Sequence, residues 1–347
     1  MRNSMSRFRV GHAVLATLLV TASANGATWY AGDFLAVGVG PRAIGMGSAV
    51  VALAEGADAP YWNPAGLART EDYAVAFEHA ERFAGIVSHD AFAASMPLTS
   101  GALGFLMFRS AIDGIIYADS TVLADPSAPL SRDNMPDPAK VRTFSNADYV
   151  FHVAYGRTLF GRVRVGAGVK FVRRSIDRTG AFGYGLDLGV QWSPAPHLAL
   201  GVTVRDASTT RVSWDNGHTD VVYPSLHVGS AYTMLFPERD VRLTLAAGSA
   251  FGSQKAGYGG FAPWRVGSSQ NPGVLGAELS WRETIMVRVG SQDVRGVLGP
   301  GSGQLTAGFG VRTALPWVPN VHRLGLDLAW MRHTLNDSYR LGGMVEF

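Results

Sequence analysis

The stretches Arg162-Val-Arg-Val-Gly-Ala-Gly-Val-Lys-Phe-Val-Arg-Arg174 and Phe182-Gly-Tyr-Gly-Leu-Asp-Leu-Gly-Val-Gln-Trp192 decide the fold. Successive side chains of a β-strand point to opposite faces, so each stretch has one apolar face and one face of glycine and polar or charged residues. A soluble β-sandwich would explain either stretch alone. The repetition along the chain, together with the high glycine content of the polar faces, is instead typical of a transmembrane β-barrel.

The alternation predicts fourteen strands, most of them close to the length that crosses a bilayer at a tilt. Their expected ranges are 72–79, 88–97, 100–112, 148–158, 162–174, 181–192, 198–206, 224–235, 241–250, 273–281, 285–293, 303–314, 321–332 and 339–347. The connections after even-numbered strands are tight, whereas those after odd-numbered strands are mostly longer, notably 113–147, 207–223 and 251–272. Short periplasmic turns and longer extracellular loops alternate in this way in outer-membrane barrels, and an even strand number leaves both ends in the periplasm.

The cost of charge in lipid assigns the two faces. An arginine or lysine that faces lipid near the midplane costs about 2–4 kcal/mol, so the charged phase must line the lumen. Aromatic residues near the strand ends, such as Trp192, Trp281 and Tyr339, fit the girdles at the two interfaces. Eight charged residues are candidates for the lumen, where we expect mutual pairing and attachment of an internal segment, with guidance of a substrate as the alternative: Arg164, Lys170, Asp187, Arg205, Glu278, Arg288, Arg312 and Asp327.

The first residues have the features of an export signal. Arg2, Arg7 and Arg9 precede the apolar stretch 13–20, and the small residues 22–24 offer a cleavage site after Ala24, with Ala27 as the second choice. Residues 1–24 are therefore expected to be a signal peptide, and the mature protein to reside in a Gram-negative outer membrane. These residues contain three arginines and no acid, so their removal leaves 27 basic and 27 acidic side chains. The basic balance of the whole chain then gives no reason to expect a nucleic-acid partner.

Catalysis and cofactor binding have little support in the sequence. There is no His-Glu-x-x-His, no Gly-x-Ser-x-Gly and no evident metal-ligand spacing among the nine histidines. Ser88-His-Asp90 and the segment 213–220 bring the residue types of a hydrolase together. We interpret them as ordinary polar loop residues, with a turn at Asn216-Gly217. We expect no cofactor, no metal and no enzymatic activity.

Residues 25–71 do not alternate and carry a family resemblance. The run Gly40-Pro-Arg-Ala-Ile-Gly-Met-Gly-Ser-Ala-Val50, followed by Tyr61-Trp-Asn-Pro-Ala-Gly-Leu67, resembles the N-terminus of FadL-like outer-membrane proteins, and it is most similar to the PorV/PorQ branch. The resemblance is close over residues 35–70. In the barrel it extends only to the strand number and the terminal Phe347.

The resemblance implies an all-β, fourteen-stranded antiparallel barrel (72–347) with an N-terminal hatch (25–71) folded inside the lumen. It places the hatch motif of Asn63, Pro64, Ala65 and Gly66 there. A barrel of this size is wide enough to hold such a segment, and small residues favour close packing of its backbone. A periplasmic tail is the alternative.

Two functions follow from the resemblance. FadL-type proteins pass long-chain fatty acids or other hydrophobic molecules, which is the preferred interpretation, and PorV-type proteins hold exported cargo for type IX secretion. An outer-membrane enzyme or a purely structural barrel is the alternative of another class. Outer-membrane lipid is an expected partner. The terminal aromatic Phe347 resembles the signal that is read by the barrel assembly machinery, the second expected partner; a hydrophobic small molecule or secretion-system proteins complete the expectation.

Overall fold

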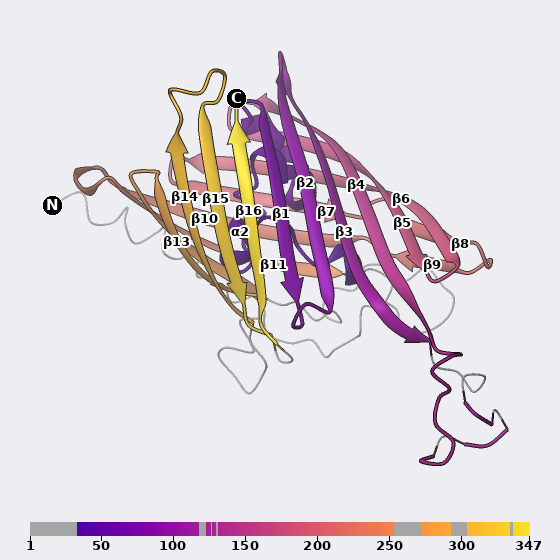
Figure 1. Cartoon of the computed structure of the whole chain (residues 1–347). Helices are drawn as coiled ribbons and strands as arrows, with labels where there is room; N and C mark the ends of the chain where they lie inside the picture. The colour runs from indigo at the N-terminus through magenta and orange to yellow at the C-terminus, as the bar shows by residue number, and fades with distance from the viewer. Residues whose placement is uncertain are drawn as a thin grey trace.

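The computed structural model describes residues 33–117, 123–125, 127–129, 131–252, 273–292, 304–333 and 336–347. The expected signal peptide and its cleavage site lie outside these residues. The described strands form one antiparallel sheet that closes into a barrel, because β1 (Ala74–Arg82) pairs with β16 (Ser338–Glu346) (Figure 1). In the described residues, no helix is long and apolar enough to cross a membrane.

The remaining strands pair with their neighbours in sequence around the wall, except that β7 pairs with β10 and β8 with β6. They are β2 (Val87–Leu98), β3 (Gly101–Tyr117), β4 (Arg142–Phe160), β5 (Val163–Ile176), β6 (Thr179–Ala195), β7 (Leu198–Arg205), β8 (Thr210–Trp214), β9 (Thr219–Val222), β10 (Ser225–Phe236), β11 (Val241–Gly252), β12 (Gly273–Trp281), β13 (Ile285–Ser291), β14 (Leu305–Ala314) and β15 (Arg323–Met331). A single 3-10 turn, η5 (Pro237–Arg239), connects β10 to β11.

The sixteen segments make fourteen wall strands, as the sequence predicts. Strand β6 pairs with β7 over its second half and with β8 over residues 181–184, so β8 continues the line of β7. Strand β9 pairs with β8 in turn, and the β8–β9 hairpin extends the wall formed by β7 and β10. The expectation of a loop over 207–223 is therefore wrong. Strand β8 has only five alternating residues, which pair with residues 181–184 of the long β6. Gly217, at φ 84°, lies in the turn between β8 and β9.

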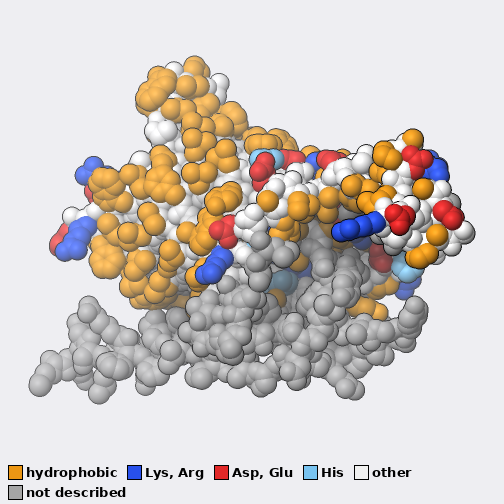
Figure 2. All heavy atoms as spheres, turned by 60° about the horizontal axis from the view of Figure 1, so that its bottom comes forward, with side chains coloured by type: hydrophobic (Ala, Val, Ile, Leu, Met, Phe, Trp, Pro, Cys, Tyr) orange, Lys and Arg blue, Asp and Glu red, His pale blue; other side chains and the backbone are white. Residues whose placement is uncertain are grey.

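The two faces of the wall are assigned as expected. In β6 the even-numbered residues from Phe182 to Trp192 are exposed, whereas Gly183, Asp187 and Gln191 on the other phase are buried. Hydrophobic side chains accordingly spread over the outer wall in Figure 2. The period-two pattern therefore predicts which side chains meet lipid and which face the lumen.

Turn lengths separate the two ends of the barrel. Residues 99–100, 161–162, 196–197 and 282–284 form tight turns at one end, where the last residue, Phe347, donates its backbone N–H to Tyr73 O at 2.8 Å. The β3–β4 connection is the long hairpin that projects from the other end in Figure 1. Because short turns face the periplasm in outer-membrane barrels, we call these the periplasmic and the extracellular end.

A chain of short helices fills the lumen ahead of β1. It comprises η1 (Asp33–Leu35), α2 (Pro41–Gly45), η2 (Gly56–Asp58), α3 (Ala59–Trp62) and η3 (Pro64–Arg69). Pro41 and Pro64 stand at helix starts, where the fixed φ of proline suits the first turn and its missing N–H costs nothing. Helix α2 packs against β13–β16 and η3 against β3–β6, so this segment (33–69, the hatch) spans the lumen from wall to wall (Figure 1).

Candidate functional site: the hatch and its contacts with the wall

The hatch rests on a ring of wall glycines. A Cβ atom added to any of them would come within 2.0 to 3.2 Å of a hatch atom, and at eight of the ten the separation would be below 3.0 Å, which is closer than a side chain allows. Ten wall strands each contribute one such glycine: Gly104, Gly156, Gly166, Gly189, Gly201, Gly229, Gly276, Gly290, Gly308 and Gly342. The glycines of the lumenal phase therefore provide the seat of the hatch.

Asn63 fixes the middle of the hatch to the wall and to the rest of the hatch. It is fully buried, and its Nδ2 donates to Val51 O at 3.0 Å and to Val190 O on β6 at 3.2 Å. Its Oδ1 accepts from Ala65 N at 3.1 Å, which caps η3. A Cβ at Gly66 would lie 2.1 Å from Ala54 O, so the glycine of the motif permits a close crossing within the hatch.

Two aromatic side chains of α3 occupy the centre of the lumen. Tyr61 Oη donates to Leu35 O at 2.7 Å, and Trp62 Nε1 donates to Val39 O at 2.8 Å. Their rings meet edge to face with centroids 4.9 Å apart. The polar atom of each ring therefore bonds to the hatch backbone, while wall residues such as Phe108 and Arg205 contact the ring faces or edges.

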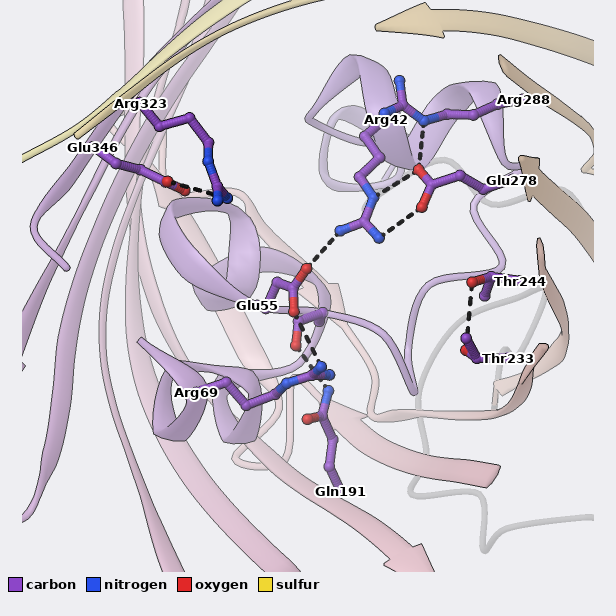
Figure 3. A network of polar contacts seen from close by, with 11 residues as sticks. Arg42, Glu55, Arg69, Gln191, Thr233, Thr244, Glu278, Arg288, Arg323 and Glu346 are labelled. Carbon is purple, nitrogen blue, oxygen red and sulfur yellow. Dashed lines mark hydrogen bonds and ion pairs between the residues drawn. The ribbon is translucent and has the colours of Figure 1, made fainter. Parts of the chain in front are cut away.

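Ion pairs fasten the hatch to the wall at α2 (Figure 3). Arg42 donates to Glu278 on β12 at 3.0 Å through both Nε and Nη2, and its Nη1 donates to Glu55 at 2.7 Å. Glu55 also pairs with Arg69 at 3.2 Å, and Glu278 accepts from Arg288 on β13 at 2.6 Å. We call this set of five residues the Arg42 latch. Bidentate arginine–carboxylate pairs are among the strongest charge-assisted hydrogen bonds in proteins.

A second fastening joins the start of the hatch to β16. Arg340 is 2% exposed, and its Nη1 donates to Gly38 O at 2.8 Å and to Glu78 Oε1 at 2.6 Å. Glu78 on β1 also accepts from the backbone N–H of Gly40 at 2.5 Å. The hatch backbone is therefore clamped between a buried cation and a buried anion of two adjoining wall strands.

Lys170 lies in a third polar cluster, which belongs to the wall alone. Its Nζ is 2.8 Å from both Asp187 and Asp206, and His152 Nδ1 is 3.7 Å from Asp187. Asp206 also accepts from Thr210 Oγ1 at 2.5 Å. This cluster lies where β7 ends and β8 begins, so it replaces the backbone pairing that is interrupted there.

The structure separates the eight lumenal candidates into different surroundings. Glu278, Arg288 and Asp327 form one buried group, in which Arg288 contacts both carboxylates. Lys170 and Asp187 belong to the wall cluster just described. The other three do not join either group: Arg164 donates to Ser193 Oγ at 2.7 Å, Arg205 stacks on hatch aromatic rings, and Arg312 has no ion-pair partner among the described residues.

Sequence reasoning missed four residues that hold the hatch: Arg42, Glu55, Glu78 and Arg340. The alternation contains a signal for two of them. Glu78 follows the outward Phe77 and lies on the lumenal phase of β1, and Arg340 lies between the outward Tyr339 and Leu341 on the lumenal phase of β16. Arg42 and Glu55 lie in the segment that does not alternate, where period-two analysis gives no information.

Two spaces adjoin the hatch. The first, of about 380 Å³, lies toward the periplasmic end between the hatch and strands β1, β2 and β14–β16, and we call it the vestibule. Charged residues of both signs line it, including Asp58, Arg69, Glu71 and Arg312. The second, of about 190 Å³, lies between Tyr61 and Trp62 on one side and strands β7, β10, β11 and β12 on the other, and we call it the Arg205 pocket.

Asp58 is a hatch carboxyl group that lines the vestibule. It has no hydrogen bond or ion pair among the described residues. Burial first, and then the neighbouring carboxylates of Glu78 and Asp327, raise the pKa of Asp58 to about 7 against the opposing effect of Arg42 and Arg312. The protonated carboxyl is thus the form that the folded hatch favours.

Hatch stability should fall as the pH rises through about 7. An acid whose pKa is raised on folding contributes fully below its unfolded pKa of about 3.9, and this contribution is lost as the pH passes the folded pKa. Hydrogen exchange of hatch amides at about pH 5.5 and about pH 8.5 measures the effect. Wild type should exchange faster at the higher pH than Asp58→Asn does, after the intrinsic pH dependence is removed. Equal pH dependence in both chains would contradict the assignment.

In the described part of the chain, no group of three or more His, Cys, Asp or Glu residues is placed to hold a metal ion. No protein-family model matches the sequence, and no curated protein sequence matches it.

Solved structures share the architecture. The CymD monoaromatic hydrocarbon channel is 14% identical, with a TM-score of 0.53, and the match covers 89% of this chain and 97% of the channel. The Pseudomonas putida toluene transporter TodX is 13% identical, with a TM-score of 0.53 and coverage of 89% and 97%. At these identities the similarity establishes the fold alone, and both proteins are transport channels by name rather than enzymes. The chain is therefore a fourteen-stranded antiparallel β-barrel with the fold of the CymD and TodX channels.

Proposed function

We propose that the protein passes small hydrophobic molecules across the outer membrane, and that the hatch must move for them to pass. The observation that carries the proposal is the way the hatch is held as a separate segment inside a wall that closes without it: wall glycines let it sit against the lumen, and polar contacts fasten it at several points. Apolar hatch side chains such as Ile44 and Leu67 also pack in cores shared with the wall. The polar fastenings can be exchanged for water as the hatch moves.

The surroundings of the hatch fit such a path. The vestibule and the Arg205 pocket share no lining residue, and the hatch motif lies in the sequence between Trp62 of the pocket and Arg69 of the vestibule. Asn63 and the Arg42 latch are then holding residues rather than catalytic ones. The two monoaromatic hydrocarbon channels and transporters of the same fold support the hydrophobic nature of the cargo.

A reversible cross-link tests whether the hatch moves. A Cβ at Gly229 on β10 would lie 3.2 Å from Val51 Cβ in the hatch, close to the Cβ–Cβ separation of a disulfide, and the chain contains no cysteine that would interfere. We expect uptake of labelled toluene by cells with Val51→Cys/Gly229→Cys to fall on oxidation and to return on reduction. Each single-cysteine variant is the matched control and should transport equally in both conditions.

Uptake that is the same in the oxidised and the reduced double variant would refute a moving hatch. Absence of uptake in wild type for toluene and for long-chain fatty acids alike would refute the transport function itself and would leave a structural barrel.

The second candidate function is a PorV-like role in type IX secretion. It is favoured only by the resemblance of residues 40–50 and 61–67 to the PorV/PorQ opening. Loss of a surface-exported cargo from cells that lack the protein, with unchanged uptake of hydrophobic molecules, would support this role over transport.

A further inference from the structure

Arg205 is a lumenal cation without an anion. It lines the Arg205 pocket at the end of β7, and no hydrogen bond or ion pair engages its guanidinium in the described part of the chain. Its Nε and Nη2 are buried without a polar partner. The carboxylates of Asp206, the next residue in the sequence, and of Asp187 are both engaged by Lys170. Arg205 itself is half-buried, and a buried donor that lacks an acceptor is costly, so its Nε and Nη2 are open to an acceptor that no described residue supplies.

The hatch holds this cation by ring contacts. The guanidinium carbon of Arg205 lies 4.5 Å from the centroid of Tyr61 and 5.3 Å from that of Trp62. Such contacts orient a guanidinium without neutralising its charge. Because hatch carbonyls anchor both rings, the cation and the two rings form a preorganised corner of the pocket.

The rest of the pocket is largely apolar. Val51 and Ala49 of the hatch face Val228, Gly229 and Val274 of the wall, and no aspartate or glutamate is among the described residues that line the pocket. An occupant therefore meets apolar surface over most of its area and one unpaired cation at one end.

The volume of the pocket suits one aromatic ring. An apolar cavity of about 150 Å³ accommodates one benzene molecule. The Arg205 pocket, at about 190 Å³, has room for one ring and one small substituent.

We propose that the Arg205 pocket binds a monoaromatic carboxylate, with the ring against the apolar walls and the carboxylate on Arg205. The proposal rests on the transport function given above and narrows its cargo from hydrophobic molecules in general to small aromatic anions. His227, which lines the same pocket and contacts Ser225 Oγ at 3.1 Å, is a second polar group within the site.

Benzoate and benzamide separate charge from shape, because they differ only in the group that would meet Arg205. Binding of each to the full-length protein in detergent micelles is measured by equilibrium dialysis for wild type, Arg205→Met, Arg205→Lys and Arg211→Met. Methionine keeps most of the packing on the rings without the charge, lysine keeps the charge, and Arg211 is an exposed arginine outside the pocket.

Wild type should bind benzoate more tightly than benzamide. Arg205→Met should weaken benzoate binding about 10- to 100-fold, as expected for the loss of a charge-assisted hydrogen bond, and should leave benzamide binding unchanged. Arg205→Lys should retain most of the preference, and Arg211→Met all of it. Equal binding of the two compounds to wild type, or full benzoate binding by Arg205→Met, would overturn the proposal.

The two proposals fail in different ways. If toluene uptake depends on the hatch cross-link but benzoate shows no preference for Arg205, the transport function stands and the assignment of the pocket is wrong. If benzoate binds through Arg205 but no hydrophobic compound crosses the membrane, the pocket is confirmed and transport is wrong.

Discussion

Replacing Val169 with arginine should block assembly of the barrel into the membrane. Val169 lies in the middle of β5 on the outward phase, is 36% exposed, and pairs with outward Val153 and Leu186 on the neighbouring strands. An arginine there would stand among lipid tails, which costs about 2–4 kcal/mol near the midplane. The heat-modifiable gel shift reports assembly, and urea unfolding in lipid vesicles gives the change in the free energy of unfolding.

Ser175→Arg is the matched control, because it adds the same charge on the same strand and the same phase. Ser175 is one residue from the extracellular end of β5, where a cation costs only about 0–1 kcal/mol. The natural outward arginine Arg173 already lies near that end. Equal tolerance of Val169→Arg and Ser175→Arg would show that the outward phase of β5 does not meet the hydrocarbon core.

The faces of the wall were predictable because a strand has a fixed period of two, so one lipid-facing residue determines the rest of its strand. The glycines of the inner phase were predictable as small lumenal residues for the same reason. The β8–β9 hairpin was not, because five alternating residues are too few to distinguish a strand from a loop. The hairpin pairs with the part of β6 that extends beyond β7, so its formation depends on the length of β6, which is a different segment of the chain.

The partners of the lumenal charges could not be read from the sequence. Periodicity places Glu278 and Arg340 inside the barrel, but it does not indicate that Arg42, 236 residues away from Glu278, reaches it. Such pairs depend on how the hatch folds within the lumen, and the hatch has no repeat that fixes its orientation. The resemblance marks Asn63 as part of a motif, whereas its bonds to Val51 and Val190 appear only in three dimensions.

Deleting residues 33–69 should convert a nearly closed barrel into an open pore. The wall closes on itself through β1 and β16 without help from the hatch, and Glu278, Arg288 and Asp327 remain paired within the wall after the deletion. The ring of glycines would then border open space, and barrels of this width leave room for water when nothing fills them. Single-channel conductance in planar bilayers should rise severalfold above that of wild type.

Glu278→Gln tests the same idea in a chain that keeps the hatch. Glutamine keeps the shape of the side chain but removes the charge that holds both Arg42 and Arg288, so the Arg42 latch loses its contact between hatch and wall. We expect brief openings to the conductance of the deletion variant, on a closed background. The oxidised Val51→Cys/Gly229→Cys chain is the opposite control and should remain closed even when Glu278→Gln is added.

These three conductance measurements distinguish a hatch that opens and closes the lumen from a hatch that only occupies it. Openings that appear with Glu278→Gln and disappear on cross-linking require a hatch that moves as a body while the wall stays intact. A deletion variant that assembles but conducts no better than wild type would mean that the hatch does not close the lumen. Openings that persist in the cross-linked chain would assign them to the wall, with the Lys170 cluster at the β7–β8 break as the next place to examine.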